Sequence, residues 1–351
     1  MTNPENIALS RLSLLQPPTC DDRSMYDLWE SVYYFPAVTV ADELGVFSLL
    51  EQEPRPAKAV AEALSLHLHP TIALLGLLTS LGFLVPYERQ FHLTEPARNF
   101  LLPNSPYYWD GVLHPSRTDK LHQFIRKALV RDAAAESKRM TGDWAAGQLG
   151  PELAERITRL MHSHSFVSAM YLAQRGSFEG VRRMLDVGGG SGCYCIALAQ
   201  RYPEMECTVL ELPVICTLTD QYVARYGLQQ RIHTHAADMF NADWPPGHDA
   251  IFFSEVFHDW NEARCHQLAR HSFERLPAGG RIYVHEILLS DTKDGPLTPM
   301  AYFLGLTTLT EGRQFTAEEL RQLLEAAGFI NIAITPSSGY YSLVSAEKPT
   351  T

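Results

Sequence analysis

The spacing of apolar residues changes at about residue 183 of this 351-residue chain. Before that point, apolar positions recur at intervals of three and four over 25–50, 57–81 and 150–180, which predicts helices. After it, short apolar runs that predict strands alternate with helical patterns, and residues 329–348 predict a terminal antiparallel hairpin. The second half is therefore predicted to be α/β, with a doubly wound and mostly parallel sheet covered by helices on both faces.

The first half predicts two short helices, over about 57–65 and 70–81, followed by a pair of strands, GFLVPYERQFHLTE. Two helices and a two-stranded wing are typical of a winged helix. A helix that reads DNA needs donors for bases and phosphates, yet the second helix, PTIALLGLLTSLG, contains no Lys, Arg or Asn. Because it is apolar on nearly every face, and Tyr33, Tyr34 and Phe35 precede it, we expect it to support a dimer interface.

Charge and composition narrow the class of protein. The net charge is -11, with 29 Lys+Arg against 40 Asp+Glu, which disfavours nucleic acid as a partner. No run of 18 apolar residues predicts a membrane span, and the first residues lack the organisation of a secretion signal. The six cysteines show no zinc spacing, and no metal is predicted. We therefore expect a cytoplasmic protein.

A glycine-rich turn follows the first strand of the second half, in the sequence MLDVGGGSGCYC. The dinucleotide fingerprint G-x-G-x-x-G fails here, because the third glycine falls on Cys193 when counted from Gly188 and on Cys195 when counted from Gly190. Asp186 just before the turn is awkward for a pyrophosphate but suits a positively charged ligand. S-adenosylmethionine carries an ammonium and a sulfonium and no phosphate, and bare glycines would let the backbone approach its methionine end.

Two further acidic positions follow the next two strands. Glu211 ends the strand ECTVLEL, where a carboxylate can accept both ribose hydroxyls. Asp238 and Met239, in AADMF after the third strand, can flank the adenine. Because ligands of such sheets bind at the carboxyl ends of the strands, the three acids together predict an adenosyl-ligand site.

His258 is the candidate general base. It follows the apolar strand DAIFFSEVF and precedes the helix NEARCHQLARHSF, which places it at the same edge of the sheet. An imidazole with a pKa of about 6.5 at this edge can accept a proton from a bound substrate near neutral pH.

Several motifs together resemble the class I S-adenosylmethionine-dependent methyltransferases. More narrowly, the chain resembles the O-methyltransferase family that includes plant caffeic acid and flavonoid enzymes, hydroxyindole O-methyltransferase and bacterial natural-product enzymes. The motifs are DVGGGSG at 186–192, AADMF at 236–240, FHDWNEARC at 257–265, LPAGGRIYVHE at 276–286, DGP at 294–296, TEGRQFT at 310–316 and EAAGF at 325–329.

The resemblance covers nearly the whole chain and implies its organisation. It implies a helical, winged-helix-like dimerisation domain over 1–103, connecting helices over 104–180, and a Rossmann-like catalytic domain over 181–351. It also implies a homodimer that converts S-adenosylmethionine to S-adenosylhomocysteine.

The resemblance also implies roles for residues around the base. His258 matches the histidine of the family's HDW motif, which acts as general base. Glu286 aligns with an acid at the end of the fifth strand, although a slip of one residue would put His285 there instead. Glu311 in TEG is the second matched acid, whereas Gln314 stands where many members have Glu.

The predicted ligand contacts complete the site. MHSHS resembles the family's M-x-x-H-S, whose Met161 and Ser165 would face substrate and cofactor. Gly305 lies where the hydroxyindole enzyme carries Asn, so the substrate is predicted to differ. Predicted cofactor contacts are Asp186, Gly188, Gly190, Glu211, Leu212, Asp238, Met239, Phe240, Ser254, Trp260 and Ser165; predicted substrate contacts are Met161, Phe166, Tyr302, Phe303 and Leu306.

The sequence thus predicts an S-adenosylmethionine-dependent O-methyltransferase of secondary metabolism that acts on a small, aromatic hydroxyl compound. The residues leave the methylated atom open, since C- or N-methyl transfer could use the same scaffold. A homologue that binds the cofactor without methyl transfer, as a lyase or cyclase, is disfavoured because the histidine of HDW is present.

Overall fold

A computed structural model describes residues 16–130, 149–241 and 243–350. The chain divides into two compact units. The sheet unit comprises Met1–Arg23, Asp143–Ile287 and Glu318–Thr351, and the helical unit comprises Ser24–Gly142 and Leu288–Ala317. The predicted domain boundaries at 103 and 180 remain predictions, and 131–148 lie outside the described residues.

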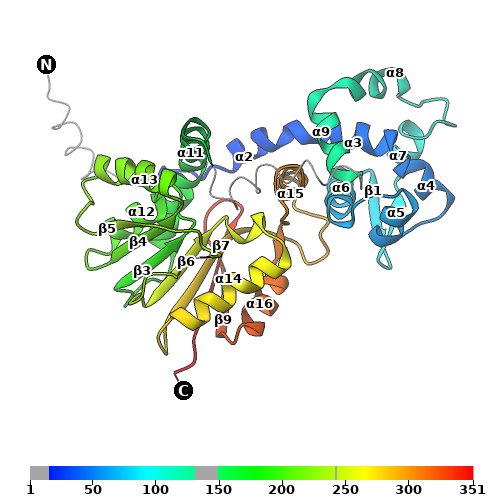
Figure 1. The fold of residues 1–351 in the computed structure, drawn as a ribbon. Helices are drawn as coiled ribbons and strands as arrows, with labels where there is room; N and C mark the ends of the chain where they lie inside the picture. The colour runs from blue at the N-terminus through cyan, green and yellow to red at the C-terminus, as the bar shows by residue number, and fades with distance from the viewer. Residues whose placement is uncertain (1–15, 131–148, 242, 351) are drawn as a thin grey trace, which may run out of the picture. The chain divides into compact units, whose positions relative to one another are not determined.

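A mixed sheet organises the sheet unit, with strand order β5-β4-β3-β6-β7-β10-β9 (Figure 1). The first five strands are parallel, and β10 runs antiparallel to both of its neighbours, β7 and β9. The predicted parallel sheet with a terminal antiparallel hairpin is therefore confirmed. The strands are β3 (Arg183–Val187), β4 (Glu206–Glu211), β5 (Ile232–Ala236), β6 (Ala250–Ser254), β7 (Arg281–Leu289), β9 (Ile330–Pro336) and β10 (Tyr341–Glu347).

Helices cover both faces of this sheet, as expected for a doubly wound fold. Figure 1 shows α12 and α13 on one face and α14 and α16 on the other. β6 reads AIFFS and its first four residues are buried, because a strand covered on both faces needs apolar side chains at every position. The helices are α11 (Pro151–Arg175), α12 (Cys193–Arg201), α13 (Pro213–Arg225), α14 (Glu262–Arg275) and α16 (Ala317–Ala326), with a 3-10 turn, η4, at Phe257–Asp259.

The helical unit contains the predicted pair of helices and its two-stranded wing. These are α5 (Ala57–Ala63), α6 (Leu68–Ser80), β1 (Leu84–Tyr87) and β2 (Gln90–Leu93). Other helical elements are α2 (Arg23–Glu30), η1 (Ser31–Tyr33), α3 (Tyr34–Glu43), α4 (Val46–Gln52), α7 (Glu95–Phe100), α8 (Asp110–Leu113), η2 (Pro115–Thr118), α9 (Lys120–Leu129) and α15 (Leu297–Leu309).

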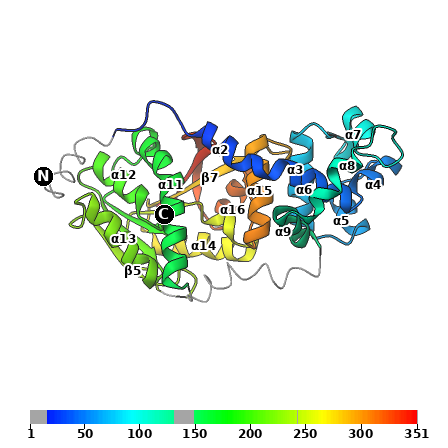
Figure 2. The same cartoon turned by 90° about the horizontal axis from the view of Figure 1, so that it is seen from above.

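A segment from the second half of the chain, α15, completes the core of the helical unit. Figures 1 and 2 show it beside α6. The two helices approach closely at Gly76, where a Cβ atom would overlap the side chain of Met300. Leu74, Leu77, Phe303 and Leu304 share one buried apolar cluster, so the two helices form a single core.

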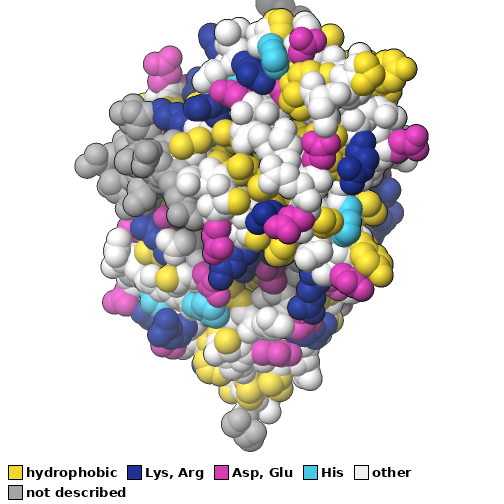
Figure 3. Space-filling model, turned by 90° about the vertical axis from the view of Figure 1, so that its right-hand side faces the viewer, with side chains coloured by type: hydrophobic (Ala, Val, Ile, Leu, Met, Phe, Trp, Pro, Cys, Tyr) yellow, Lys and Arg dark blue, Asp and Glu magenta, His cyan; other side chains and the backbone are white. Residues whose placement is uncertain are grey.

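The surface of the helical unit mixes charges of both signs. On the described part of the face drawn in Figure 3, Lys and Arg side chains are interspersed with Asp and Glu and with small apolar groups. Among the described residues, no helix combines the length and apolar character needed to cross a membrane.

Candidate active site

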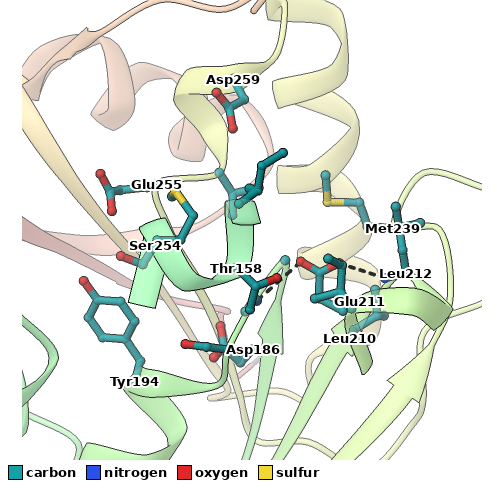
Figure 4. Close-up of a pocket in the computed structure, with 18 of the residues that line it drawn as sticks. Thr158, Asp186, Tyr194, Leu210, Glu211, Leu212, Met239, Ser254, Glu255 and Asp259 are labelled. Carbon is teal, nitrogen blue, oxygen red and sulfur yellow. Dashed lines mark hydrogen bonds between the residues drawn. The ribbon is translucent and has the colours of Figure 1, made fainter. Parts of the chain in front are cut away.

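The carboxyl ends of the parallel strands surround a cavity in the sheet unit (Figure 4). Its volume is about 1040 Å³, including the open mouth. The first half of α11 contributes Thr158 and Met161 to one wall. Every residue predicted to contact the cofactor lines it, namely Asp186, Gly188, Gly190, Glu211, Leu212, Asp238, Met239, Phe240, Ser254, Trp260 and Ser165.

The glycine turn forms the floor of this cavity. Gly188 and Gly190 have φ of 71° and 53°, a left-handed conformation that favours glycine. A Cβ atom at Gly189 would lie 2.5 Å from Oδ2 of Asp186, whereas one at Gly190 would meet nothing within 4 Å. The backbone is therefore bare where it borders the open cavity.

Two acids stand beside this turn. Asp186 is 1% exposed and accepts a hydrogen bond from the thiol of Cys195 at 3.2 Å. Glu211 accepts the backbone N–H groups of Gly190 at 3.3 Å and of Leu212 at 2.7 Å. Burial raises the pKa of each carboxyl to about 7. A ligand that brings positive charge or hydroxyl donors would therefore stabilise the ionised form of both.

One wall of the cavity is aromatic and combines Phe240, which follows β5, with Trp260, which follows η4. The rings of Phe240 and Trp260 meet edge to face with centroids 4.7 Å apart. The Arg264 guanidinium lies 4.7 Å from the centre of the first ring and 4.6 Å from that of the second. Asp238 fixes the turn by accepting the N–H of Phe240 at 2.9 Å. Aromatic rings such as these offer apolar surface on which a purine can pack.

His258 lies in η4, directly after β6, and is 2% exposed. Its Nδ1 is 3.0 Å from Oε2 of Glu286, and its Nε2 is 3.7 Å from Oδ1 of Asp259. Burial acts to lower the pKa of His258, but the carboxylates of Glu286, Asp259 and Glu255 together outweigh it and raise the pKa to about 10. Val256 and Asp259, which precede and follow this histidine in the sequence, line the cavity.

The register of β7 distinguishes the two candidate partners of this imidazole. Glu286 faces His258, whereas His285 points to the other side of the strand, as neighbours on a strand do. The ring of His285 bridges hydroxyls, with Nδ1 3.2 Å from Ser254 Oγ and Nε2 3.1 Å from Ser337 Oγ. Burial lowers the pKa of His285 to about 3, so this ring is neutral. Glu286 is thus the acid beside His258.

Comparison with known proteins identifies the family. A family model described as an O-methyltransferase domain matches residues 128–330, more than half of the chain. The chain belongs to the O-methyltransferase family. It is 30% identical over 303 residues to 3-hydroxy-5-methyl-1-naphthoate 3-O-methyltransferase of Streptomyces sahachiroi, covering 86% of this chain and 88% of that protein.

Solved structures of O-methyltransferases share the fold. An O-methyltransferase family 2 protein from Planctomyces limnophilus, in complex with apigenin, matches with a TM-score of 0.84 at 26% identity, covering 95% of this chain and 98% of that one. Human N-acetylserotonin methyltransferase in complex with SAM matches with a TM-score of 0.59 at 24% identity, covering 95% and 100%. The present protein is thus an S-adenosylmethionine-dependent O-methyltransferase acting on small molecules.

The residues that line the cavity of this O-methyltransferase fit S-adenosylmethionine. The turn at Gly190 leaves room for the ligand, and the buried carboxyls of Asp186 and Glu211 suit its positive charge and its hydroxyls. The wall formed by Phe240 and Trp260 suits its adenine.

Sequence reasoning missed two side chains of this O-methyltransferase site. His162 on α11 places Nδ1 2.9 Å from Ser191 Oγ in the glycine turn, and its ring stacks on Phe166 at 4.9 Å. Glu255 lines the cavity immediately after β6. The strand-end rule that found Asp186 could have found Glu255, whereas no local signal indicates the contact between His162 and the turn.

The predicted substrate contacts of the O-methyltransferase fall in several places. Met161 lines the cavity. Phe166 instead packs on His162 and Tyr226 and is not among the described residues that line the cavity. The other three are on α15 in the helical unit, where Phe303 and Leu306 are buried and Phe303 belongs to the apolar core. Tyr302 is partly buried on the same helix.

Three polar or small positions of the family motifs also lie in the helical unit. Glu311 is in the loop between α15 and β8 (Phe315–Thr316), and Gln314 in the same loop is fully buried. A Cβ atom at Gly305 would lie 2.8 Å from Cζ of Tyr33, so close packing against Tyr33 favours glycine at this position. The catalytic role of Glu311 stays a prediction.

Proposed function

We propose that this enzyme methylates a hydroxyl of a small aromatic metabolite, with His258 as general base and Glu286 as the acid that orients it. The observation that carries this proposal is the 3.0 Å approach of His258 Nδ1 to Glu286. When Nδ1–H donates a hydrogen bond to the carboxylate, Nε2 of the neutral ring is the nitrogen left to take a proton from the substrate hydroxyl. The names of a naphthoate-methylating relative and of an apigenin complex support an aromatic acceptor.

Different residues around the cavity would bind different parts of S-adenosylmethionine. S-adenosylmethionine would supply an activated methyl group, so the protein mainly aligns the acceptor and removes its proton. Asp186, Gly188 and Gly190 would hold the methionine end, and Glu211 the ribose hydroxyls. The hydrophobic wall of Met239, Phe240 and Trp260 would hold the adenine, with Leu212, Asp238, Ser254 and Ser165 completing the lining.

Glu311 would be the second acid, because it matches the acid of the family's TEG motif. Met161 would contact the substrate, because it lines the cavity. Asp259 lies 3.7 Å from Nε2 of His258 and lines the same cavity. Its carboxyl would help stabilise the imidazolium that forms when the base takes its proton.

We propose that the enzyme is a homodimer. One face of α2, η1 and the first turn of α3 carries exposed apolar side chains at intervals of three or four, which is the pattern of a helix that packs against protein. Soluble proteins rarely leave such a stripe in water. The exposed fractions are 64% for Met25, 68% for Leu28, 42% for Trp29, 52% for Val32 and 42% for Phe35.

The experiment that tests the reaction is a product screen with S-adenosylmethionine labelled in its methyl group. Phenols, amines and 2-oxo acids are offered in parallel, to the wild type and to His258→Ala. We expect label in a phenolic ether, with turnover falling by about 10²–10⁴-fold in the variant, the usual range for loss of a general base. Unchanged turnover in the variant would exclude His258 as the base, and label on nitrogen or carbon would replace O-methylation as the reaction.

A further inference from the structure

Glu255 has an unusual backbone for its residue type. It follows β6 directly and has a φ of 54°, in the left-handed region that favours glycine. Its N–H donates to the carbonyl of His285 at 3.1 Å, and the next residue, Val256, packs so closely on Gly188 that a Cβ there would lie 3.0 Å away. A strained non-glycine residue held from two sides is a common feature of ligand sites.

The carboxylate of Glu255 is fixed as firmly as its backbone. It is 5% exposed, lines the cavity, and accepts the hydroxyl of Ser165 at 3.1 Å and that of Tyr341. His164 Nδ1 lies 3.6 Å from the same oxygen that Ser165 contacts. Burial acts to raise the pKa of Glu255, but His164, His258 and the two hydroxyls together lower it. The ionised form of Glu255 is therefore favoured at this point of the cavity wall.

Its position along the cavity determines which part of a ligand it would meet. Figure 4 shows Glu255, Ser254 and Tyr194 on the side of the cavity opposite Met239 and Leu212. If Met239 and Glu211 take the adenosyl group, an extended S-adenosylmethionine directs its amino-acid chain toward Glu255.

The amino-acid chain carries an ammonium and a carboxylate, and the charges of the cavity wall favour binding of the ammonium. Among the described residues that line the cavity there is no Lys or Arg, whereas Asp186, Glu211, Asp238, Glu255 and Asp259 are acidic. We propose that Glu255 binds the α-ammonium of S-adenosylmethionine, so that the amino-acid end is held through its positive charge rather than through its carboxylate. This inference rests on the proposed placement of the cofactor in the cavity.

Asp186 is the competing anchor, since it also borders the glycine turn. It differs from Glu255 in two respects. Asp186 Oδ2 accepts a hydrogen bond from the thiol of Cys195, whereas Glu255 accepts two hydroxyls. Burial raises the pKa of the Asp186 carboxyl to about 7, whereas the pKa of Glu255 is lowered. Glu255 is therefore the carboxylate that carries its charge before a ligand arrives.

The test measures affinity by titration calorimetry for four ligands that differ only in the groups at issue. S-adenosylmethionine and S-adenosylhomocysteine both keep the ammonium, decarboxylated S-adenosylmethionine keeps it without the carboxylate, and 5′-methylthioadenosine lacks the whole chain. The proteins are the wild type, Glu255→Gln, and Glu262→Gln as a matched control on an exposed side chain at the start of α14.

We expect Glu255→Gln to weaken the three ammonium-bearing ligands by about tenfold, the usual worth of a charge-assisted hydrogen bond. Its affinity for 5′-methylthioadenosine should stay within about twofold, which also shows that the variant is folded. The wild type should bind the decarboxylated ligand at least as tightly as S-adenosylmethionine, and Glu262→Gln should change none of the four.

Three outcomes would overturn the inference. The first is equal affinity of wild type and Glu255→Gln for S-adenosylmethionine. The second is an equal loss for 5′-methylthioadenosine, which would make Glu255 a structural residue. The third is a loss for S-adenosylmethionine but not for S-adenosylhomocysteine, which would assign Glu255 to the sulfonium. A wild type that binds neither of these two would contradict the proposed placement of the cofactor itself.

Discussion

Nδ1 of His258 lies 3.0 Å from a carboxylate oxygen of Glu286, and the two side chains are 2% and 1% exposed. Two elements bring them together, since His258 is in the turn after β6 and Glu286 is on the adjacent strand β7. Because both side chains are almost inaccessible to solvent, the charge of Glu286 acts on the imidazole with little screening and favours its protonated form.

This pair predicts an alkaline rise in activity that moves when Glu286 loses its charge. The pKa of His258 is raised to about 10, so its basic form is a minor one at neutral pH and turnover should increase as pH rises toward 10. In Glu286→Gln, burial acts with less opposition and lowers the pKa of the imidazole. The rise in kcat should then begin at least about one pH unit lower, with a smaller maximum because the ring is less well oriented.

The same pair predicts how stability depends on pH. The folded-state pKa of His258, about 10, exceeds the unfolded value of about 6.5. The contribution of the pair to the free energy of unfolding is therefore complete below pH 6.5 and is lost as pH rises toward 10. Denaturant unfolding at pH 6 should show Glu286→Gln less stable than wild type by about 3 kcal/mol. A gap that stays constant up to pH 10 would contradict this linkage.

Affinity for S-adenosylmethionine should rise with pH and then level off. Burial raises the pKa of Asp186 and of Glu211 to about 7, and a positively charged ligand favours the ionised forms. Calorimetry between pH 5.5 and 8.5 should thus show affinity increasing by up to about tenfold per unit for each group, with a plateau above pH 7. Asp186→Asn should flatten the slope, and a pH-independent wild type would speak against both carboxyls as ligand contacts.

Gly189→Ala should disable the cavity floor. The new Cβ would lie 2.5 Å from Oδ2 of Asp186, so the carboxyl or the turn must move. We expect a loss of about 1–3 kcal/mol in stability from overpacking and at least tenfold weaker binding of S-adenosylmethionine. Gly111→Ala is the matched control, because a Cβ at that helical position meets nothing within 4 Å. Equal melting temperatures and affinities for the two variants would contradict the close approach at Gly189.

The proposed dimer makes a separate prediction. Val32→Glu puts a charge into the apolar stripe of α2 and η1, where Val32 is 52% exposed. The cost of burying an unpaired charge should shift the protein from dimer to monomer in light scattering behind size exclusion. Val85→Glu changes a side chain that is 47% exposed on β1 and should leave the mass unchanged. A dimer that persists in Val32→Glu would place the interface elsewhere.

The order of strands and helices could be predicted because strands buried on both faces are apolar throughout, which separates them from the amphipathic helices between them. The same contrast exposed Asp186 and Glu211, which are acids at the ends of apolar runs. The helices expected at about 57–65 and 70–81 are Ala57–Ala63 and Leu68–Ser80 in the structure.

What could not be predicted depends on contacts between distant segments. The apolar residues of α15 are buried around nearly the whole helix, so no amphipathic face indicates that it packs on α6. Phe166 is one residue from Ser165, yet it packs on His162 rather than lining the cavity, because adjacent helical residues point about 100° apart. The choice between His285 and Glu286 required the register of β7, which a slip of one residue would reverse.

The position of β10 between β7 and β9 has a consequence for synthesis on the ribosome. A nascent polypeptide that has emerged only as far as β9 exposes β7 as an unprotected edge, open to pairing with other chains. The hydroxyl of Tyr341, which contacts Glu255, is also delivered by this late strand. Translation must therefore proceed past residue 347 before either the sheet or the ligand cavity can be finished, and chaperone protection would matter most during that interval.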